Sequence, residues 1–273
     1  MRIGVCAIAK NEHLYINEWV KHYLNMGFDF VYLFDNDDKD KPYILDCIEN
    51  PYRKKIVIDN VRGIHKKDFQ MECYTKFYSE YKDCFDWCLF CDIDEFLVGT
   101  DNIKEFFKQP QFKSAYQVRV QWKMFTDSGL IERDMRKGVV ETFTETTKKA
   151  LGRDLTKPSN LCLQGKSFVK GGYKNVHFIS CHYASLKFSN QMIPSILPSG
   201  RICYSGTTIL DDYSHETLFL NHYMTKSLSE FLNQKMNRTD AIFDTRVLDM
   251  NYYWQINEKT PKKLKYLKRK HIL

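Results

Sequence analysis

The twelve residues 87–98, WCLFCDIDEFLV, decide how this chain is expected to fold. The first five are apolar or thiol side chains of the kind that fill a buried strand, and Asp92, Asp94 and Glu95 follow them. Burying an unpaired carboxylate is unfavourable, and neighbouring carboxylates also repel one another. The stretch therefore predicts a core strand whose end opens into a site that stabilises negative charge.

Upstream of this stretch, apolar runs alternate with segments of helical periodicity. The runs that predict strands are 2–9, 30–35 and 55–59. Between them, 16–27 repeats its apolar residues at helical spacing and stops at Gly27, and 67–83 forms a longer helical pattern. Strands that alternate with helices of this length predict βαβ units. The expected fold class is therefore α/β, with a mostly parallel sheet flanked by helices.

Each of the four predicted strands ends in acid or amide side chains. These ends are Lys10–Asn11–Glu12, Asp35–Asn36, Asp59–Asn60 and Asp92–Asp94–Glu95. Ligands bind beyond the carboxyl ends of such strands, so the pattern predicts a ligand crevice. Two carboxylates in an Asp-X-Asp arrangement suit Mg²⁺ or Mn²⁺, which also accept phosphate oxygens. The alternative is an acidic cap on the next helix, but the position at the fourth polar strand end favours the metal site.

The pattern becomes less regular after about residue 100. Residues 114–125 alternate like a strand, and glycine-containing loops follow to about residue 215. The segment 225–238 predicts a helix, with Leu228, Phe231, Leu232 and Lys235 on one stripe. We expect an α/β half at 1–100, a second half of the same domain at 101–260, and a basic tail at 261–273.

Composition indicates a folded protein without a membrane span. Hydrophobic residues make up 43% of the 273 residues, which is enough for a large core. No apolar run approaches the roughly 20 residues of a span, and the N-terminus does not resemble a signal peptide, so we expect a cytoplasmic protein. The nine cysteines are expected to be free. Cys88 and Cys91 lie three apart on a strand, which predicts buried thiols facing opposite sides and not a metal clamp.

The net charge of +7 is concentrated at one end of the chain. Six basic residues of the tail leave a net charge of only +1 on the rest: Lys262, Lys263, Lys265, Lys268, Arg269 and Lys270. The body has no basic stripe or nucleic-acid-binding motif, which disfavours nucleic acid as a partner. A basic end with Leu264 and Leu267 indicates peripheral attachment to anionic lipid at the inner face of the cytoplasmic membrane. A solvated, frayed terminus is the alternative.

Several of these motifs, in order and spacing, resemble glycosyltransferases of the GT-A fold, in particular the family-2-like and family-92-like group. The motifs are K-N-E at 10–12, Glu18–Trp19 in the first helix, D-N at 35–36, D-x-D-E-F at 92–96, and the segment 221–238 that begins N-H-Y. The match is loose from about 125 to 215. The resemblance implies a Rossmann-like GT-A sheet, with a nucleotide-sugar-binding half before residue 100 and an acceptor-binding half after it.

The resemblance also implies an activity. A sugar would pass from a nucleotide-sugar donor, a UDP-sugar, to a glycan or lipid-linked glycan acceptor, with inversion and with Mn²⁺ or Mg²⁺ as cofactor. The implied donor-binding residues are Ala7, Lys10, Asn11, Glu12, Asp35, Asn36, Lys66 (or Lys67), Gln70 and Lys226. Asp35 would bind the nucleobase, Asn36 would support its loop, and Lys226 would meet the diphosphate.

The metal ligands implied by the resemblance are Asp92, Asp94 and His222, with Asp94 as the first direct ligand. Glu95 would steady the sugar as a catalytic residue. The acceptor base would come from the second half, with Asp127 as the leading candidate because it follows the strand that contains Trp122. The alternatives for the base are Glu132, Asp211, Asp212 and Glu216.

Some of these residues also have structural interpretations. His222 could equally be a buried structural histidine, and His177 and His182 alternate on a predicted strand, where they carry less weight. Trp122 could stack on a sugar or belong to the core. A phosphatase of the haloacid dehalogenase type would need a small hydroxyl residue where Phe96 stands. A non-catalytic nucleotide- or glycan-binding protein of the same fold is the main alternative function.

Overall fold

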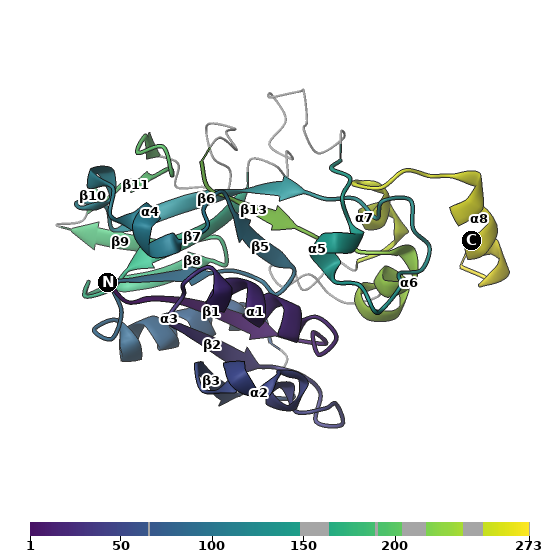
Figure 1. The fold of residues 1–273 in the computed structure, drawn as a ribbon, viewed down its shortest axis with the longest axis horizontal. Helices are drawn as coiled ribbons and strands as arrows, with labels where there is room; N and C mark the ends of the chain where they lie inside the picture. Colours follow the sequence, from purple (N-terminus) through teal and green to yellow (C-terminus); the bar gives the residue numbers. More distant parts are fainter. Residues whose placement is uncertain (65, 148–163, 189–190, 204–216, 237–247, 273) are drawn as a thin grey trace.

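The computed structural model describes the chain except for residues 65, 148–163, 189–190, 204–216, 237–247 and 273. Its N-terminal third contains four parallel strands in the spatial order β3–β2–β1–β4 (Figure 1). Their bounds are Ile3–Ala9 for β1, Phe30–Asp35 for β2, Ile56–Asn60 for β3 and Trp87–Phe90 for β4. The predicted α/β fold with a mostly parallel sheet flanked by helices is confirmed.

Helices cover both faces of this block because successive strand residues point to opposite sides. Val5 of β1 belongs to the apolar cluster that contains α1, Ile16–Asn25. Its neighbour Cys6 belongs to the cluster that contains α3, Phe69–Tyr81. Two short elements connect β2 to β3: η1 at Ile44–Cys47 and α2 at Asn50–Arg53.

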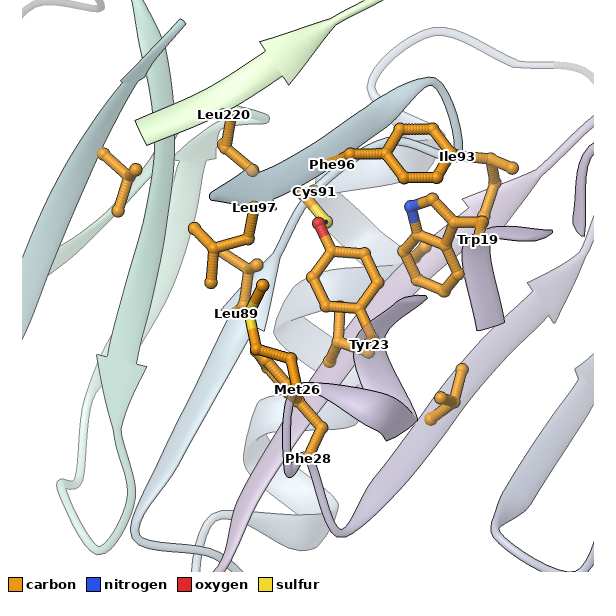
Figure 2. Close-up of a cluster of buried hydrophobic side chains, with 14 of the residues drawn as sticks. Trp19, Tyr23, Met26, Phe28, Leu89, Cys91, Ile93, Phe96, Leu97 and Leu220 are labelled. Atoms are coloured by element: carbon orange, nitrogen blue, oxygen red, sulfur yellow. Dashed lines mark hydrogen bonds between the residues drawn. The ribbon is translucent and has the colours of Figure 1, made fainter. Parts of the chain in front are cut away.

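Helix α1 buries the stripe that its spacing predicts: Ile16, Trp19, Val20, Tyr23 and Leu24. The helix is followed by Gly27, whose φ of +96° is a left-handed conformation that glycine adopts without strain. Figure 2 shows Trp19 and Tyr23 projecting from α1 toward Cys91 and Phe96. The helix therefore packs against the residues that follow β4.

The second half of the chain extends the same sheet. β7 pairs antiparallel with β4, β6 pairs antiparallel with β7, and the sheet continues through β11 and β12, so that it has ten strands among the described residues. The bounds are Glu95–Val98 for β5, Gln117–Met124 for β6, Gly165–Lys170 for β7, Ser195–Ile196 for β11, Ile202–Cys203 for β12 and Phe219–His222 for β13. β13 pairs parallel with β6 and antiparallel with β5. The same sheet therefore contains strands from both sides of residue 100, where the two predicted halves meet.

Smaller elements surround this sheet. A three-stranded antiparallel sheet has the order β10–β9–β8, and β8 packs against α3. The bounds are Ile103–Phe107 for α4, Pro110–Phe112 for η2, Val139–Thr142 for α5, Val176–Ser180 for β8, Tyr183–Phe188 for β9 and Gln191–Met192 for β10. Among the described residues, no helix has the length and apolar character needed to cross a bilayer.

The C-terminal helices form an apolar cluster of their own, made by Leu228, Phe231, Tyr253 and Leu267. The elements are α6 at Leu228–Glu230, η4 at Phe231–Lys235, α7 at Met250–Trp254 and α8 at Pro261–Arg269. The predicted basic tail is a docked helix, α8, whose cap Thr260 accepts a hydrogen bond from the Lys263 N–H. Leu267 is fully buried in this cluster, so it packs within the protein.

The thiols also lie as predicted. Cys88 and Cys91 are free and fully buried, and they belong to the apolar clusters on opposite faces of the sheet. Burial raises the pKa of both thiols well above the ordinary value. These two cysteines are core residues.

Candidate functional site

The candidate site lies at the carboxyl edge of the parallel strands. Ala9 of β1 is in register with Asp35 of β2, and Asp92 follows β4 on the other side of β1. Helix α1 holds the loop after β4 in place: the Trp19 indole donates to the Glu95 carbonyl at 2.9 Å, and the Tyr23 hydroxyl donates to the same oxygen at 3.0 Å. Helix α1 therefore fixes the segment that carries the acids through two hydrogen bonds.

Asp94, Glu95 and His222 form a compact group of potential metal ligands among the described residues. One ligand atom from each lies within 4.8 Å of the others, and all three residues are buried. The pairing of β13 with β5 creates the group, because it sets His222 opposite Glu95. His222 Nε2 lies 3.4 Å from Asp94 Oδ1, and the ring of Trp122 packs against the imidazole.

Lys235 neutralises one side of this group. Its Nζ lies 2.5 Å from Asp94 Oδ2 and 2.6 Å from the Met224 carbonyl oxygen. Burial by itself raises the pKa of Asp94, but Lys235 and His222 outweigh burial and hold the pKa well below its usual range. These two partners therefore favour the ionised form of Asp94.

Asp92 carries its own partners and lies outside the three-residue group. Lys166 Nζ is 2.8 Å from Asp92 Oδ2, and the Gln70 amide donates to Asp92 Oδ1 at 2.6 Å. Burial raises the pKa of Asp92, but the Lys166 ammonium and the Gln70 hydrogen bond lower it by more. Gln70, which we expected at the nucleotide, positions the Asp92 carboxylate in this structure.

Glu95 has the least compensated carboxylate of the three. It is fully buried; Oε2 accepts a hydrogen bond from the Asp92 N–H at 3.1 Å, whereas Oε1 has no hydrogen bond and lies 3.9 Å from Lys166 Nζ. Burial raises the pKa of Glu95 well above its usual range, and the negative charges of Asp92 and Asp94 raise it further. The positive charge of Lys166 lowers the pKa but does not offset burial. A buried oxygen without a donor is an acceptor available to a ligand.

These donors fit a divalent cation such as Mn²⁺ or Mg²⁺. Carboxylate oxygens are the ligands these ions prefer, and His222 offers an imidazole nitrogen as a further donor. The Glu95 oxygen without a hydrogen bond supports this fit. Because Lys235 already contacts Asp94, a cation that binds Asp94 has to compete with this ammonium.

A second group of buried acids lies at the end of β2. Asp35 and Asp37 are both fully buried, and each has an Oδ2 atom without a hydrogen bond. The Asn11 N–H donates to Asp37 Oδ1, and Arg62 Nε lies 3.5 Å from Asp35 Oδ1. Asn36 donates to the carbonyl oxygens of residues 61 and 64, which ties that segment to β2. The Oδ2 atoms of Asp35 and Asp37 are therefore two available hydrogen-bond acceptors at the end of β2.

Lys226, from the C-terminal half of the chain, lies beside Glu12 at the end of β1. Its Nζ lies 4.0 Å from Glu12 Oε2 and 4.1 Å from the centre of the Tyr15 ring. Burial lowers the pKa of Lys226, and its φ of +54° is a conformation that lysine rarely adopts. A buried lysine therefore lies beside the end of β1, and the surrounding structure maintains its unfavourable backbone conformation.

Asp127, the leading candidate for the base, lies in a structural network. Lys263 Nζ is 2.5 Å from its Oδ2, the Tyr253 hydroxyl donates to the same atom, and the Gly129 N–H donates to Oδ1 at 2.9 Å. Asp127 is 2% exposed. With both oxygens bonded to the protein, Asp127 joins the loop after β6 to α7 and α8. Its role as a base stays a prediction that these contacts disfavour.

Other predicted residues also lie away from the acids. Ala7 is fully buried in the core, and Lys66 is exposed and pairs with Glu72. Glu132 and His177 are exposed, and Asp211, Asp212 and Glu216 lie outside the described residues. His182 is buried against Trp122, and burial lowers its pKa to about 3. His182 is therefore a neutral imidazole.

Sequence reasoning missed four charged residues at these sites: Asp37, Arg62, Lys166 and Lys235. Lys235 had a signal, because it lies on the apolar stripe predicted for 225–238. Lys166 had a weaker one, as a charge near the start of the strand GKSFVK. A lysine at a position that should be buried indicates a carboxylate partner elsewhere in the chain.

Comparison with known proteins does not assign the chain to a family. No family model matches the chain, and a search of curated proteins found no similar sequence. The class that the fold and site define is an α/β protein with buried acids and lysines at the carboxyl edge of its parallel strands.

Proposed function

We propose that the chain is a metal-dependent glycosyltransferase, which moves a sugar from a UDP-sugar or related nucleotide-sugar to a glycan or glycolipid acceptor with inversion. The observation that carries the proposal is the buried group of Asp94, Glu95 and His222 at the carboxyl edge of the parallel strands. The GT-A-like order of the motifs in the sequence supports the same conclusion.

The proposal gives the two groups of acids separate tasks. At β2, the Asp35 and Asp37 oxygens without hydrogen bonds can accept the N–H of a nucleobase such as uracil. At β4, a divalent cation on Asp94, Glu95 and His222 would neutralise the diphosphate leaving group. Lys226 and Lys235 add positive charge where that group departs. The two groups of acids lie at the same edge of the sheet and are separated by one strand, because β1 lies between β2 and β4.

Deprotonation of the acceptor is a separate requirement of an inverting transfer. Asp127 does not perform it in this proposal, because Lys263, Tyr253 and Gly129 occupy its oxygens. Glu95 is a cation ligand in this proposal, and its role in orienting the sugar would act through the bound cation.

One observation favours a second candidate, a non-catalytic protein that binds a nucleotide or a glycan. Asp92 and Asp94 each have a lysine within 2.8 Å, so two of the three negative charges are balanced without a cation. Such a site can be stable as a binding surface alone. Turnover of a donor separates the two candidates.

Calorimetry with UDP, with and without Mn²⁺, tests the proposal. We expect binding that needs Mn²⁺ and that is lost in Asp94→Ala, whereas Asp101→Ala, which removes an exposed acid, keeps it. Binding that is independent of Mn²⁺ or unchanged in Asp94→Ala would contradict the proposal.

A donor screen then tests catalysis. Release of UDP from one of a set of UDP-sugars, with the product anomer resolved by NMR, supports the transferase. Metal-dependent binding without consumption of any donor supports the non-catalytic candidate.

A further inference from the structure

Helix α8 has one cationic face and one buried face. Lys262, Lys265 and Arg269 lie three and four residues apart, which puts them on one side of a helix, and all are exposed. Lys263 and Leu267 lie on the opposite side and are at most 1% exposed. No acidic residue occurs after position 258, so nothing within the helix balances the exposed charge.

The buried face fixes the direction of the cationic face. Lys263 Nζ lies 2.5 Å from Asp127 Oδ2, and Leu267 packs with Phe231 and Tyr253. The helix cannot rotate without breaking this ion pair and exposing Leu267. The exposed basic side chains are therefore held toward solvent. Helix α8 itself lies at the end of the molecule far from the N-terminus (Figure 1).

The exposed side of α8 carries a shallow, open patch. It is formed by Pro261, Leu264, Lys265, Lys268 and Arg269. Three cationic side chains thus lie beside a small apolar surface. Like charges three and four residues apart repel one another and weaken a helix, so this arrangement costs stability that an anionic partner would recover.

We propose that the exposed face of α8 docks on a membrane surface rich in anionic phospholipid. Charge complementarity identifies the occupant: phosphate headgroups match the three cations of the patch, while the chain before the basic tail carries a net charge of only +1. The helix lies on the surface without deep insertion, because Leu267 faces the protein and Leu264 is half-buried. This inference does not depend on the proposed activity.

Vesicle sedimentation of the full chain, without nucleotide or metal, tests the docking surface. We expect the protein to sediment with vesicles of phosphatidylcholine mixed with phosphatidylglycerol, but not with phosphatidylcholine alone. Added salt should weaken the binding because it screens exposed charges.

The double variant Lys265→Gln, Arg269→Gln should reduce partitioning onto the anionic vesicles by at least about tenfold, since each basic residue near the surface contributes roughly fivefold. Lys54→Gln, Lys55→Gln removes the same charge from exposed positions between α2 and β3 and should change it little. Thermal unfolding of both variants checks that α8 remains folded.

Equal binding to neutral and anionic vesicles, or equal losses in the two double variants, would overturn the proposal. A duplex DNA that displaces the protein from the vesicles at equal phosphate concentration would also overturn it and assign the face to nucleic acid. A failure here would leave the UDP and Mn²⁺ binding of the strand-end site untouched, so the two proposals fail separately.

Discussion

Asp94 and Asp127 are both buried carboxylates with a lysine Nζ at 2.5 Å, yet their surroundings differ. The side chain of Lys263 is 2% exposed, and Asp127 also accepts from Tyr253 and Gly129. The side chain of Lys235 is 17% exposed, so it can leave Asp94 for solvent. At Asp127 every acceptor has a fixed donor, whereas the acids around Asp94 include an oxygen without one.

This difference separates a charge pair that belongs to the scaffold from one that a ligand can enter. A buried ion pair whose partners are all fixed is costly to break and offers nothing to a ligand. A cluster with more acids than fixed donors has capacity for a cation. The following experiments test this distinction in order of decreasing expected effect.

Asp127→Asn should lower the free energy of unfolding by about 3–5 kcal/mol, because it leaves Lys263 as a buried charge without its partner. Urea unfolding measures the loss as a lower midpoint at an unchanged slope. Asp101→Asn, at an exposed position, is the control and should change little. A midpoint equal to that of the wild type would mean that the ion pair does not hold the C-terminal helices.

Tyr253→Phe should cost about 1.5–3 kcal/mol, the usual range for a hydrogen bond to a charged group. The substitution removes only the hydroxyl that donates to Asp127 and keeps the buried ring in its cluster. Tyr266→Phe, a half-buried ring on α8, provides the matched control. Equal stability of the two variants would show that the scaffold does not need this donor.

Lys235→Ala should tighten Mn²⁺ binding in the absence of nucleotide by about tenfold, or 1.4 kcal/mol. The ammonium competes with a cation for Asp94, and the variant removes the competitor. Titration calorimetry measures the affinity, with Lys108→Ala, at an exposed position, as control. Weaker or unchanged Mn²⁺ binding in Lys235→Ala would contradict an exchangeable partner at Asp94.

Glu95→Gln should stabilise the protein by on the order of 1 kcal/mol at about pH 8. The pKa of Glu95 is raised above the ordinary value of 4.5. The wild type is therefore most stable below about pH 4.5, where the Glu95 carboxyl is protonated in both the folded and the unfolded state. It loses this stability as the pH rises through the folded-state pKa of Glu95, whereas the neutral glutamine side chain of the variant does not titrate.

The gain from Glu95→Gln should consequently disappear toward about pH 4, where the wild-type carboxyl is protonated in both states. Thermal unfolding of the two proteins across this pH range gives the difference. A variant that is less stable than the wild type at about pH 8 would show that the Glu95 charge is compensated after all.

The sequence predicted the parallel strands, the stripe of α1 and the burial of Cys88 and Cys91, because each follows from local periodicity. It also indicated the acids after β4. It did not predict Lys166 beside Asp92, since this contact depends on β7 pairing antiparallel with β4. It favoured Asp127 as a base from its place after a strand, and no local pattern signals Tyr253 or Lys263 as its partners.

Local patterns were enough to locate the carboxylates that follow the apolar strands and the basic residues of the tail, because residue type and spacing are properties of a short stretch. Which charge lies against which depends on the folded chain. Asp94 and Lys235 are 141 positions apart, and the interaction of two charges depends on their distance in space and on the water excluded around them. The chain order carries neither quantity, so the division between a structural and an exchangeable ion pair emerges only on folding.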